Sequence, residues 1–267
     1  MRAVAGAMSE IARAAEAARD ALAAGGRLVY VGAGTSGRLG ALDAAECPPT
    51  FGARPEQVIA LIAGGPRALR RAVEGAEDDA GDGARQIRRA RVAPADLVIG
   101  ISASASTPYV LGALAQARQA GARTVLVCCN AIAPDRRAAE IVIALDTGPE
   151  LIAGSTRLKA GTATKLVLNA ISTAAFVLLG KVYRGRMVDL RPTNEKLRAR
   201  AERIVTELTG LPERDARTLL LRARGSPKLA VAMHLTGLAP PAAGRALAKR
   251  GLRGLEPPQR RGARSSR

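Results

Sequence analysis

The stretch from residue 27 to residue 52, RLVYVGAGTSGRLGALDAAECPPTFG, constrains the fold more than any other part of the sequence. An apolar run rich in β-branched residues ends at Gly32, glycine recurs at Gly34 and Gly37, and helix-forming residues resume at Arg38. This order predicts a strand, a glycine-rich turn and a helix. Because glycines let the backbone approach a ligand and a helix start offers free N–H groups, the turn is a candidate phosphate site.

The candidate ligand-binding residues of this turn are Gly34, Thr35, Ser36, Gly37 and Arg38. Two other interpretations stay open on the residues alone: a tight turn without a ligand, and a dinucleotide site. A dinucleotide site calls for an acidic ribose partner about 20 residues further on, and Glu56 is a poor one. The two hydroxyls favour a small phosphorylated ligand instead.

Further apolar runs alternate with helical segments along the chain. We expect strands at 28–31, 57–63, 97–102, 124–129 and 141–145. We expect helices at 1–24, 38–45, 66–73, 84–91, 109–120, 159–179, 194–209, 214–224 and 227–235. Near-continuous apolar strands between helices predict an α/β fold with a doubly wound, five-stranded parallel sheet. Ligands gather at the carboxyl ends of such strands, so the loops after the first and third strands are the first places to look.

The helices beyond residue 190 predict a small C-terminal helical appendage. We therefore expect a main domain over 1–190, a small helical domain over 191–251 and a basic, disordered tail over 252–267.

The loop after the third strand is rich in hydroxyl groups, and proline follows in the first turn of the next helix. The candidate phosphate-binding residues here are Ser102, Ser104, Ser106 and Thr107. Hydroxyls and helix N–H groups together favour an anion, whereas simple capping of the strand end is the alternative. Ser155, Thr156 and Lys159 are candidates for adding hydroxyls and positive charge across the cleft.

General acid or base chemistry falls mainly to carboxylates in this chain. The sole histidine, His234, lies in the predicted appendage, far in sequence from both loops. Glu46 lies between an apolar helix and a Pro48-Pro49 corner, where partial burial would raise its pKa and suit it to donate a proton. A helix-end carboxylate held by backbone donors is the alternative for Glu46, and a solvated acidic face is the alternative for Glu77.

Charge, cysteine content and hydrophobicity argue against a nucleic-acid-binding, disulfide-rich or membrane-spanning protein. The net charge is +18, and the chain from Arg184 onward holds 20 Lys and Arg against 7 Asp and Glu. An Arg-rich solvated surface explains this charge better than nucleic-acid binding. Three cysteines without CxxC spacing imply neither a disulfide framework nor a metal site, which suits a reducing cytosol. No stretch reaches the roughly 20 apolar residues of a membrane span, so we expect a soluble, cytoplasmic protein.

Several blocks give the chain a resemblance to a known family, the N-acetylmuramic acid 6-phosphate etherases. The blocks are GAGTSGRLG and ECPPT within 32–50, GAED at 75–78, STPYV at 106–110, GSTRLKAGTATKLVLN at 154–169 and KVYRGRMVDLRPTNEKL at 181–197. The resemblance covers roughly residues 20–250, in unchanged order. It implies a sugar-isomerase (SIS) type, flavodoxin-like fold, related to glucokinase regulatory proteins.

The resemblance also implies an activity. The family's proton donor matches Glu46, and its second essential acid or base matches Glu77. The implied reaction is that of a carbon–oxygen lyase, in which elimination and hydration cleave the D-lactyl ether of N-acetylmuramic acid 6-phosphate. The products are N-acetylglucosamine 6-phosphate and D-lactate, in the recycling of cell-wall amino sugars. It implies no metal and no cofactor, and a homodimer, because SIS domains build the sugar site near a subunit contact.

The chain departs from the family in two places. Ala105-Ser106 stands where relatives usually have Gly-Arg, which restricts the backbone and removes a charge. Relatives also usually carry a segment before the first helix, whereas the sequence here begins almost at the helix expected over 1–24. A catalytically weak, sugar-phosphate-binding regulatory protein is therefore an alternative function. A SIS-type transcriptional regulator is a third, but no helix-turn-helix motif precedes residue 27.

Overall fold

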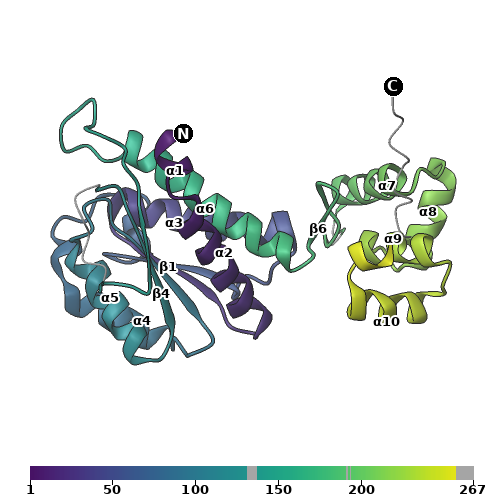
Figure 1. The fold of residues 1–267 in the computed structure, drawn as a ribbon, viewed down its shortest axis with the longest axis horizontal. Coiled ribbons are helices and arrows are strands. Elements are labelled where there is room, and N and C mark those ends of the chain that lie inside the picture. The colour runs from purple at the N-terminus through teal and green to yellow at the C-terminus, as the bar shows by residue number, and fades with distance from the viewer. Residues whose placement is uncertain (131–136, 191, 193, 257–267) are drawn as a thin grey trace, which may run out of the picture. The chain divides into compact units, whose positions relative to one another are not determined.

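A five-stranded parallel sheet forms the centre of the larger of two units (Figure 1). The structure is a computed structural model, and it describes residues 1–130, 137–190, 192 and 194–256. The strands are β1 (Leu28–Gly32), β2 (Val58–Ile62), β3 (Leu97–Ile101), β4 (Arg123–Cys128) and β5 (Ile141–Ala144). The predicted sheet is confirmed, with strand ends within one residue of expectation.

The strand order, β2-β1-β3-β4-β5, decides where a ligand binds. The chain moves outward from β1 to β2 and then crosses back, so β1 and β3 are neighbours. All residues of these two strands are buried, as expected for a sheet covered on both faces. The loops after β1 and β3 therefore lie side by side at the switch in strand order.

Helices cover both faces of the sheet. Packed on one face are α4 (Ala80–Arg89) and α5 (Pro108–Gln119), whose apolar side chains share a core with β1, β3 and β4. On the other face lie α1 (Arg2–Ala5), α2 (Met8–Ala23), α3 (Gly34–Phe51) and α6 (Lys159–Leu178) (Figure 1). Among the described residues α6 alone has the length and apolar composition to cross a membrane, and half of that window is buried against the rest of the protein.

Four helix predictions need correction. The helix expected over 1–24 is two helices, α1 and α2, which are separated at Gly6-Ala7. The helix expected over 66–73 is only a 3-10 turn, η1 (Pro66–Leu69), since the Leu69 carbonyl accepts from Arg38 Nε instead (3.2 Å). Capping by Asp79, whose Oδ1 accepts from Asp82 N (2.7 Å), starts α4 at Ala80 rather than residue 84.

The fourth correction concerns Pro48 and Pro49, which lie inside α3 instead of forming a corner. Proline removes a helix N–H and crowds the preceding turn. Here the helix nevertheless continues through both prolines to Phe51.

The second unit comprises residues 50–52 and the described residues from Gly180 onward. Its helices are α7 (Glu195–Thr209), α8 (Glu213–Arg222), α9 (Pro227–Thr236) and α10 (Pro240–Arg250), followed by η3 (Arg253–Leu255). It also contains a small antiparallel hairpin of β6 (Val182–Tyr183) and β7 (Arg186–Met187). The sequence analysis missed the hairpin and α10.

The core of this second unit extends into the segment that we expected to be a tail. Leu252 and Leu255 are buried in it with residues of α7 to α10. Asn194 caps α7 as predicted, with its Oδ1 accepting from Leu197 N (2.8 Å). The rest of the expected tail, residues 257–267, lies outside the described residues.

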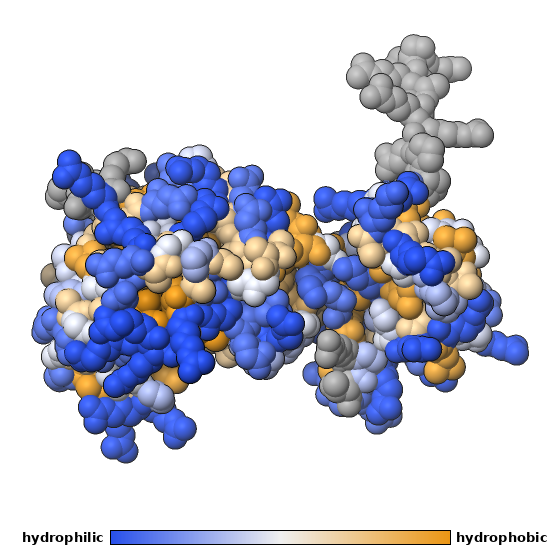
Figure 2. All heavy atoms as spheres, turned by 90° about the horizontal axis from the view of Figure 1, so that it is seen from below, coloured by the Kyte–Doolittle hydropathy of each residue, from blue (hydrophilic) through white to orange (hydrophobic). Residues whose placement is uncertain are grey.

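Figure 2 shows one face of the protein, where charged and polar side chains cover most of the surface and smaller hydrophobic patches lie between them.

Candidate active site

A cavity of about 350 Å³ opens at the carboxyl ends of β1 and β3. Eight of the predicted residues line it: Gly34, Thr35, Ser36, Glu77, Ser104, Ser106, Thr107 and Thr156. They come from four segments, which are the start of α3, the 3-10 turn η2 (Ala76–Asp78), the loop into α5 and the segment before α6. The two loops predicted to hold phosphate thus meet in one place, which we call the anion pocket.

The loop after β1 packs the start of α3 closely against the end of that strand. Gly37 is buried, and a Cβ there would lie 2.5 Å from Ile62 Cγ1 and 2.7 Å from the Gly32 carbonyl oxygen. Glycine at this position therefore serves close packing of α3 on the sheet, not ligand contact. Arg38 does not line the anion pocket, since its side chain reaches the Leu69 carbonyl.

The second loop is ordered by its own hydroxyl groups. Ser102 is buried beneath the anion pocket, where its Oγ lies 2.7 Å from Thr107 Oγ1 and accepts from Thr107 N (3.3 Å). Ser106 Oγ donates to Ser104 Oγ (2.9 Å). Ser102 therefore shapes the loop, while Ser104, Ser106 and Thr107 face the cavity.

Ala105 adopts a left-handed backbone conformation, with φ = 65°. Such a conformation is strained for any residue with a Cβ and free of strain for glycine. Ala105 therefore occupies a position whose backbone conformation favours glycine.

Replacing Ala105 by glycine is expected to stabilise the protein by about 1 kcal/mol, because relief of the left-handed strain exceeds the entropy that glycine adds to the unfolded chain. Thermal or urea unfolding measures this gain. Ala103→Gly is the matched control, since Ala103 in the same loop has ordinary φ and its substitution should destabilise. Equal losses in the free energy of unfolding in both variants would contradict strain at Ala105.

Two carboxylates face the anion pocket from η2, Glu77 and Asp78. Both side chains are exposed, and the turn that carries them is entered at Gly75 with φ = 71°. The next residue, Asp79, is occupied in capping α4. The sequence analysis singled out Glu77 and missed Asp78, although both stand in the acidic run before α4.

Glu46 lies away from the anion pocket of its own chain. It stands on α3 ten residues after Ser36, a separation of about 15 Å along the helix. Its side chain is exposed, so the partial burial expected for it is absent from the single chain. Within one chain, therefore, Glu46 and Glu77 do not face a common space.

The remaining predicted residues lie outside the anion pocket. Lys159 lines a separate, largely apolar cavity of about 800 Å³ with Met1, Leu151 and Arg157. Its backbone N–H donates to Glu150 Oε2 (3.0 Å), which caps α6 together with the bond from Ala160 N to Glu150 Oε1 (2.9 Å). Ser155 lines neither of these two cavities.

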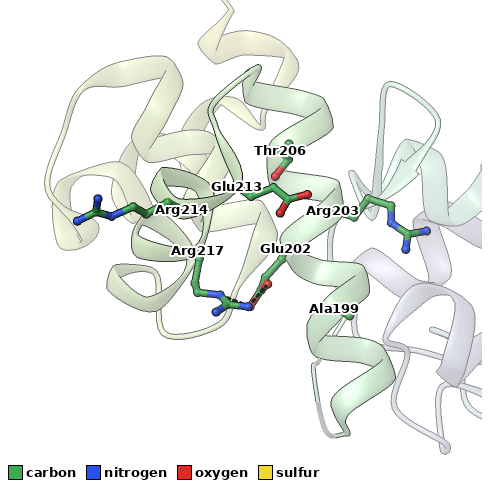
Figure 3. A pocket seen from close by; sticks show the side chains of 7 residues that line it. All are labelled: Ala199, Glu202, Arg203, Thr206, Glu213, Arg214 and Arg217. Carbon is green, nitrogen blue, oxygen red and sulfur yellow. Dashed lines mark hydrogen bonds and ion pairs between the residues drawn. The ribbon is translucent and has the colours of Figure 1, made fainter.

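A further cavity of about 400 Å³ lies between α7 and α8 in the second unit (Figure 3). Its prominent feature is the ion pair of Arg217 and Glu202, joined by two hydrogen bonds of 3.1 Å and 3.0 Å. Arg203 and Arg214 point away from the cavity (Figure 3). Two of its charged residues are thus paired with each other, and two arginines are turned outward.

The anion pocket depends on backbone dipoles more than on charged side chains. The starts of α3 and α5 both point into it, and a helix start carries partial positive charge. Its lining, among the described residues, contains two carboxylates and no lysine or arginine. No group of three His, Cys, Asp or Glu side chains in the described part of the chain could hold a metal ion.

Three protein-family models match the chain. The glucokinase regulatory protein N-terminal SIS domain matches residues 4–118, and the SIS domain matches residues 79–174. The C-terminal lid domain of glucokinase regulatory protein matches residues 184–231. A solved phosphoheptose isomerase from Francisella tularensis is similar over 63% of this chain and 86% of that one, with 17% identity and a TM-score of 0.48.

Two curated relatives are much more similar. The N-acetylmuramic acid 6-phosphate etherase of Cutibacterium acnes is 53% identical over 236 residues, 88% of this chain and 78% of the relative. That of Erwinia tasmaniensis is 52% identical over 252 residues, 93% of this chain and 82% of the relative. With more than half of the residues identical over most of both chains, this protein belongs to the N-acetylmuramic acid 6-phosphate etherase family.

Proposed function

We propose that this protein is a lyase that cleaves the D-lactyl ether of N-acetylmuramic acid 6-phosphate. The products are N-acetylglucosamine 6-phosphate and D-lactate, and the setting is cytoplasmic recycling of cell-wall amino sugars. The observation that carries the proposal is the high identity to etherases, together with Glu77 in a pocket built by two helix starts.

The anion pocket suits the sugar phosphate. The phosphate accepts hydrogen bonds from the N–H groups at the starts of α3 and α5 and from the hydroxyls of Thr35, Ser36 and Ser104. Glu77 faces the same space, so a sugar held by its phosphate extends past this carboxylate. Thr156 lines the same cavity.

The chemistry is an elimination followed by a hydration. In the ring-opened sugar the aldehyde at C1 acidifies the hydrogen on C2, and the Glu77 carboxylate removes that proton. The C3–O bond breaks, and the departing lactate oxygen takes a proton from the carboxyl group of Glu46. Water then adds at C3 of the unsaturated aldehyde and gives a proton to the Glu46 carboxylate, while the proton held by Glu77 returns to C2. Proton transfers of this kind contribute about 10²- to 10⁴-fold each.

Glu46 reaches this reaction from a second copy of the chain. Its place about 15 Å along α3 from Ser36 precludes contact with its own pocket. The exposed surface of α3 beside it is apolar: Leu42 is 49% exposed, and Ala45 and Pro49 are exposed too. A homodimer with its twofold axis beside α3 buries these residues and turns each Glu46 toward the partner.

The decisive test is to incubate the purified protein with N-acetylmuramic acid 6-phosphate and to assay D-lactate enzymatically. Stoichiometric release of D-lactate and N-acetylglucosamine 6-phosphate is expected. A folded protein that binds the sugar phosphate but releases no lactate would overturn the proposal. That outcome would favour the regulatory alternative, to which the strained Ala105 in the altered loop gives some support.

A further inference from the structure

Asp43 is a buried carboxylate with no part in the proposed chemistry. It lies on α3 and is 4% exposed. Its Oδ2 accepts from the hydroxyl of Tyr30 on β1 (2.6 Å), and its Oδ1 accepts from Asn169 Nδ2 (2.6 Å) and Ser172 Oγ (3.1 Å) on α6. One side chain therefore ties α3 both to the sheet and to the neighbouring helix.

Burying such a network costs free energy, and its hydrogen bonds fix the geometry of the groups that they join. Burying a carboxylate is unfavourable unless its oxygens are hydrogen-bonded, and apolar side chains of similar size often serve stability as well or better. What the network adds is a fixed geometry. Burial, and secondarily the Asp43 carboxylate, raises the pKa of Tyr30 well above its ordinary value, so Tyr30 stays protonated as a donor.

A second contact fixes the same stretch of α3. A Cβ at Gly40 would lie 2.8 Å from Tyr30 Cβ, so the helix is pressed against β1 one turn before Asp43. Cys47, one turn after Asp43, is also buried. Rotation of α3 about its axis is thus restricted in the turns that carry Glu46.

Glu46 is sensitive to that rotation. At 3.6 residues per turn it lies about 60° round the helix from Asp43, at the border between the buried and exposed surfaces. For a helix about 10 Å across, a turn of 10° moves a side chain at its rim by about 1 Å. A displacement of that size can cost a reaction on the order of 10²-fold.

We propose that Asp43 is a positioning residue that holds α3 at the rotation from which Glu46 protonates the departing lactate. The inference rests on the proposed function and on its use of Glu46. In this inference the hydrogen bonds from Tyr30, Asn169 and Ser172 to Asp43 affect catalysis by positioning Glu46. They have no role in binding the phosphate.

The first test is steady-state kinetics of Asp43→Asn. An asparagine has a single acceptor oxygen, which can face either Asn169 and Ser172 or Tyr30 but not both, so one side of the network loses its acceptor with almost no change in shape. We expect kcat to fall by about 10- to 100-fold with KM within about twofold, because the anion pocket is untouched. Asp96→Asn is the matched control: Asp96 is equally buried, its carboxylate holds Arg27 at the opposite end of β3, and kcat should stay within about twofold of wild type.

The second test is the exchange Asp43→Asn with Asn169→Asp. In this double variant the amide at 43 donates to the carboxylate at 169 and still accepts from Tyr30, so the network is rebuilt with its polarity reversed. We expect at least half of the lost kcat to return. Failure of rescue in a protein that melts like wild type would overturn the inference.

Mixed dimers separate this inference from the proposed function. Asp43→Asn subunits should regain activity with Glu77→Gln subunits, which supply a well-placed Glu46, and should regain none with Glu46→Gln subunits. If wild type releases lactate and Glu46→Gln is defective while Asp43→Asn keeps its kcat, the inference fails and the function stands. If wild type releases no lactate, the proposed function itself has failed.

Discussion

Replacing Glu77 by glutamine is expected to lower kcat for lactate release by about 10²- to 10⁴-fold. Glutamine keeps the size of the side chain but cannot take the proton from C2. Binding of the sugar phosphate should change by less than about fivefold, since hydroxyls and helix N–H groups on other elements hold the phosphate. Lactate assays and calorimetric titration with the product sugar phosphate measure the two quantities separately.

Asp78→Asn is the matched control for this prediction. It removes the same charge from the next residue of the same turn, and Asp78 also lines the anion pocket. We expect a loss of less than about tenfold, because removing a neighbouring charge shifts local pKa values without removing the base. A larger loss for Asp78→Asn than for Glu77→Gln would transfer the role of base to Asp78.

Mixing two inactive variants is expected to restore activity. If each site combines Glu77 of one chain with Glu46 of the other, Glu46→Gln and Glu77→Gln subunits form hybrid dimers with one intact site. Random assembly makes half of the dimers hybrid, so about a quarter of wild-type activity should return. Subunits carrying different affinity tags, unfolded and refolded together, allow the hybrids to be isolated and assayed.

The control mixture combines Glu46→Gln subunits with subunits that carry both substitutions. No hybrid of these two has an intact site, so activity should stay at the level of the single variants. Purified Glu46→Gln and Glu77→Gln hybrids without activity would disprove the shared site, as would full activity of Glu46→Gln alone.

The sheet was readable from the sequence because its strands are buried on both faces. Continuous apolar runs such as Leu97–Ile101 have few other interpretations, and their ends follow from flanking turns. The positions of the two loops that line the anion pocket were predicted for the same reason, since glycines and hydroxyl residues directly after buried strands lie at the edge of the sheet. Their meeting in one cavity follows from β1 and β3 being neighbours.

Other features depend on contacts that periodicity does not encode. The prolines in α3 suggested a corner beside Glu46, but the helix continues through them to Phe51. Two-residue strands such as β6 leave no pattern to detect. By contrast, α10 had a usable signal, with Pro240 in its first turn and Gly251 directly after its end.

Among the described residues, no lysine or arginine lines the anion pocket, so holding the phosphate and attracting it over longer distances depend on different charges. Peptide dipoles at two helix starts act only over about the last turn, so they hold a phosphate that has already arrived. Drawing the metabolite in from bulk solution is left to the net charge of +18, whose field dissolved salt screens. Ionic strength should therefore govern how often substrate arrives and have little influence on how long it stays.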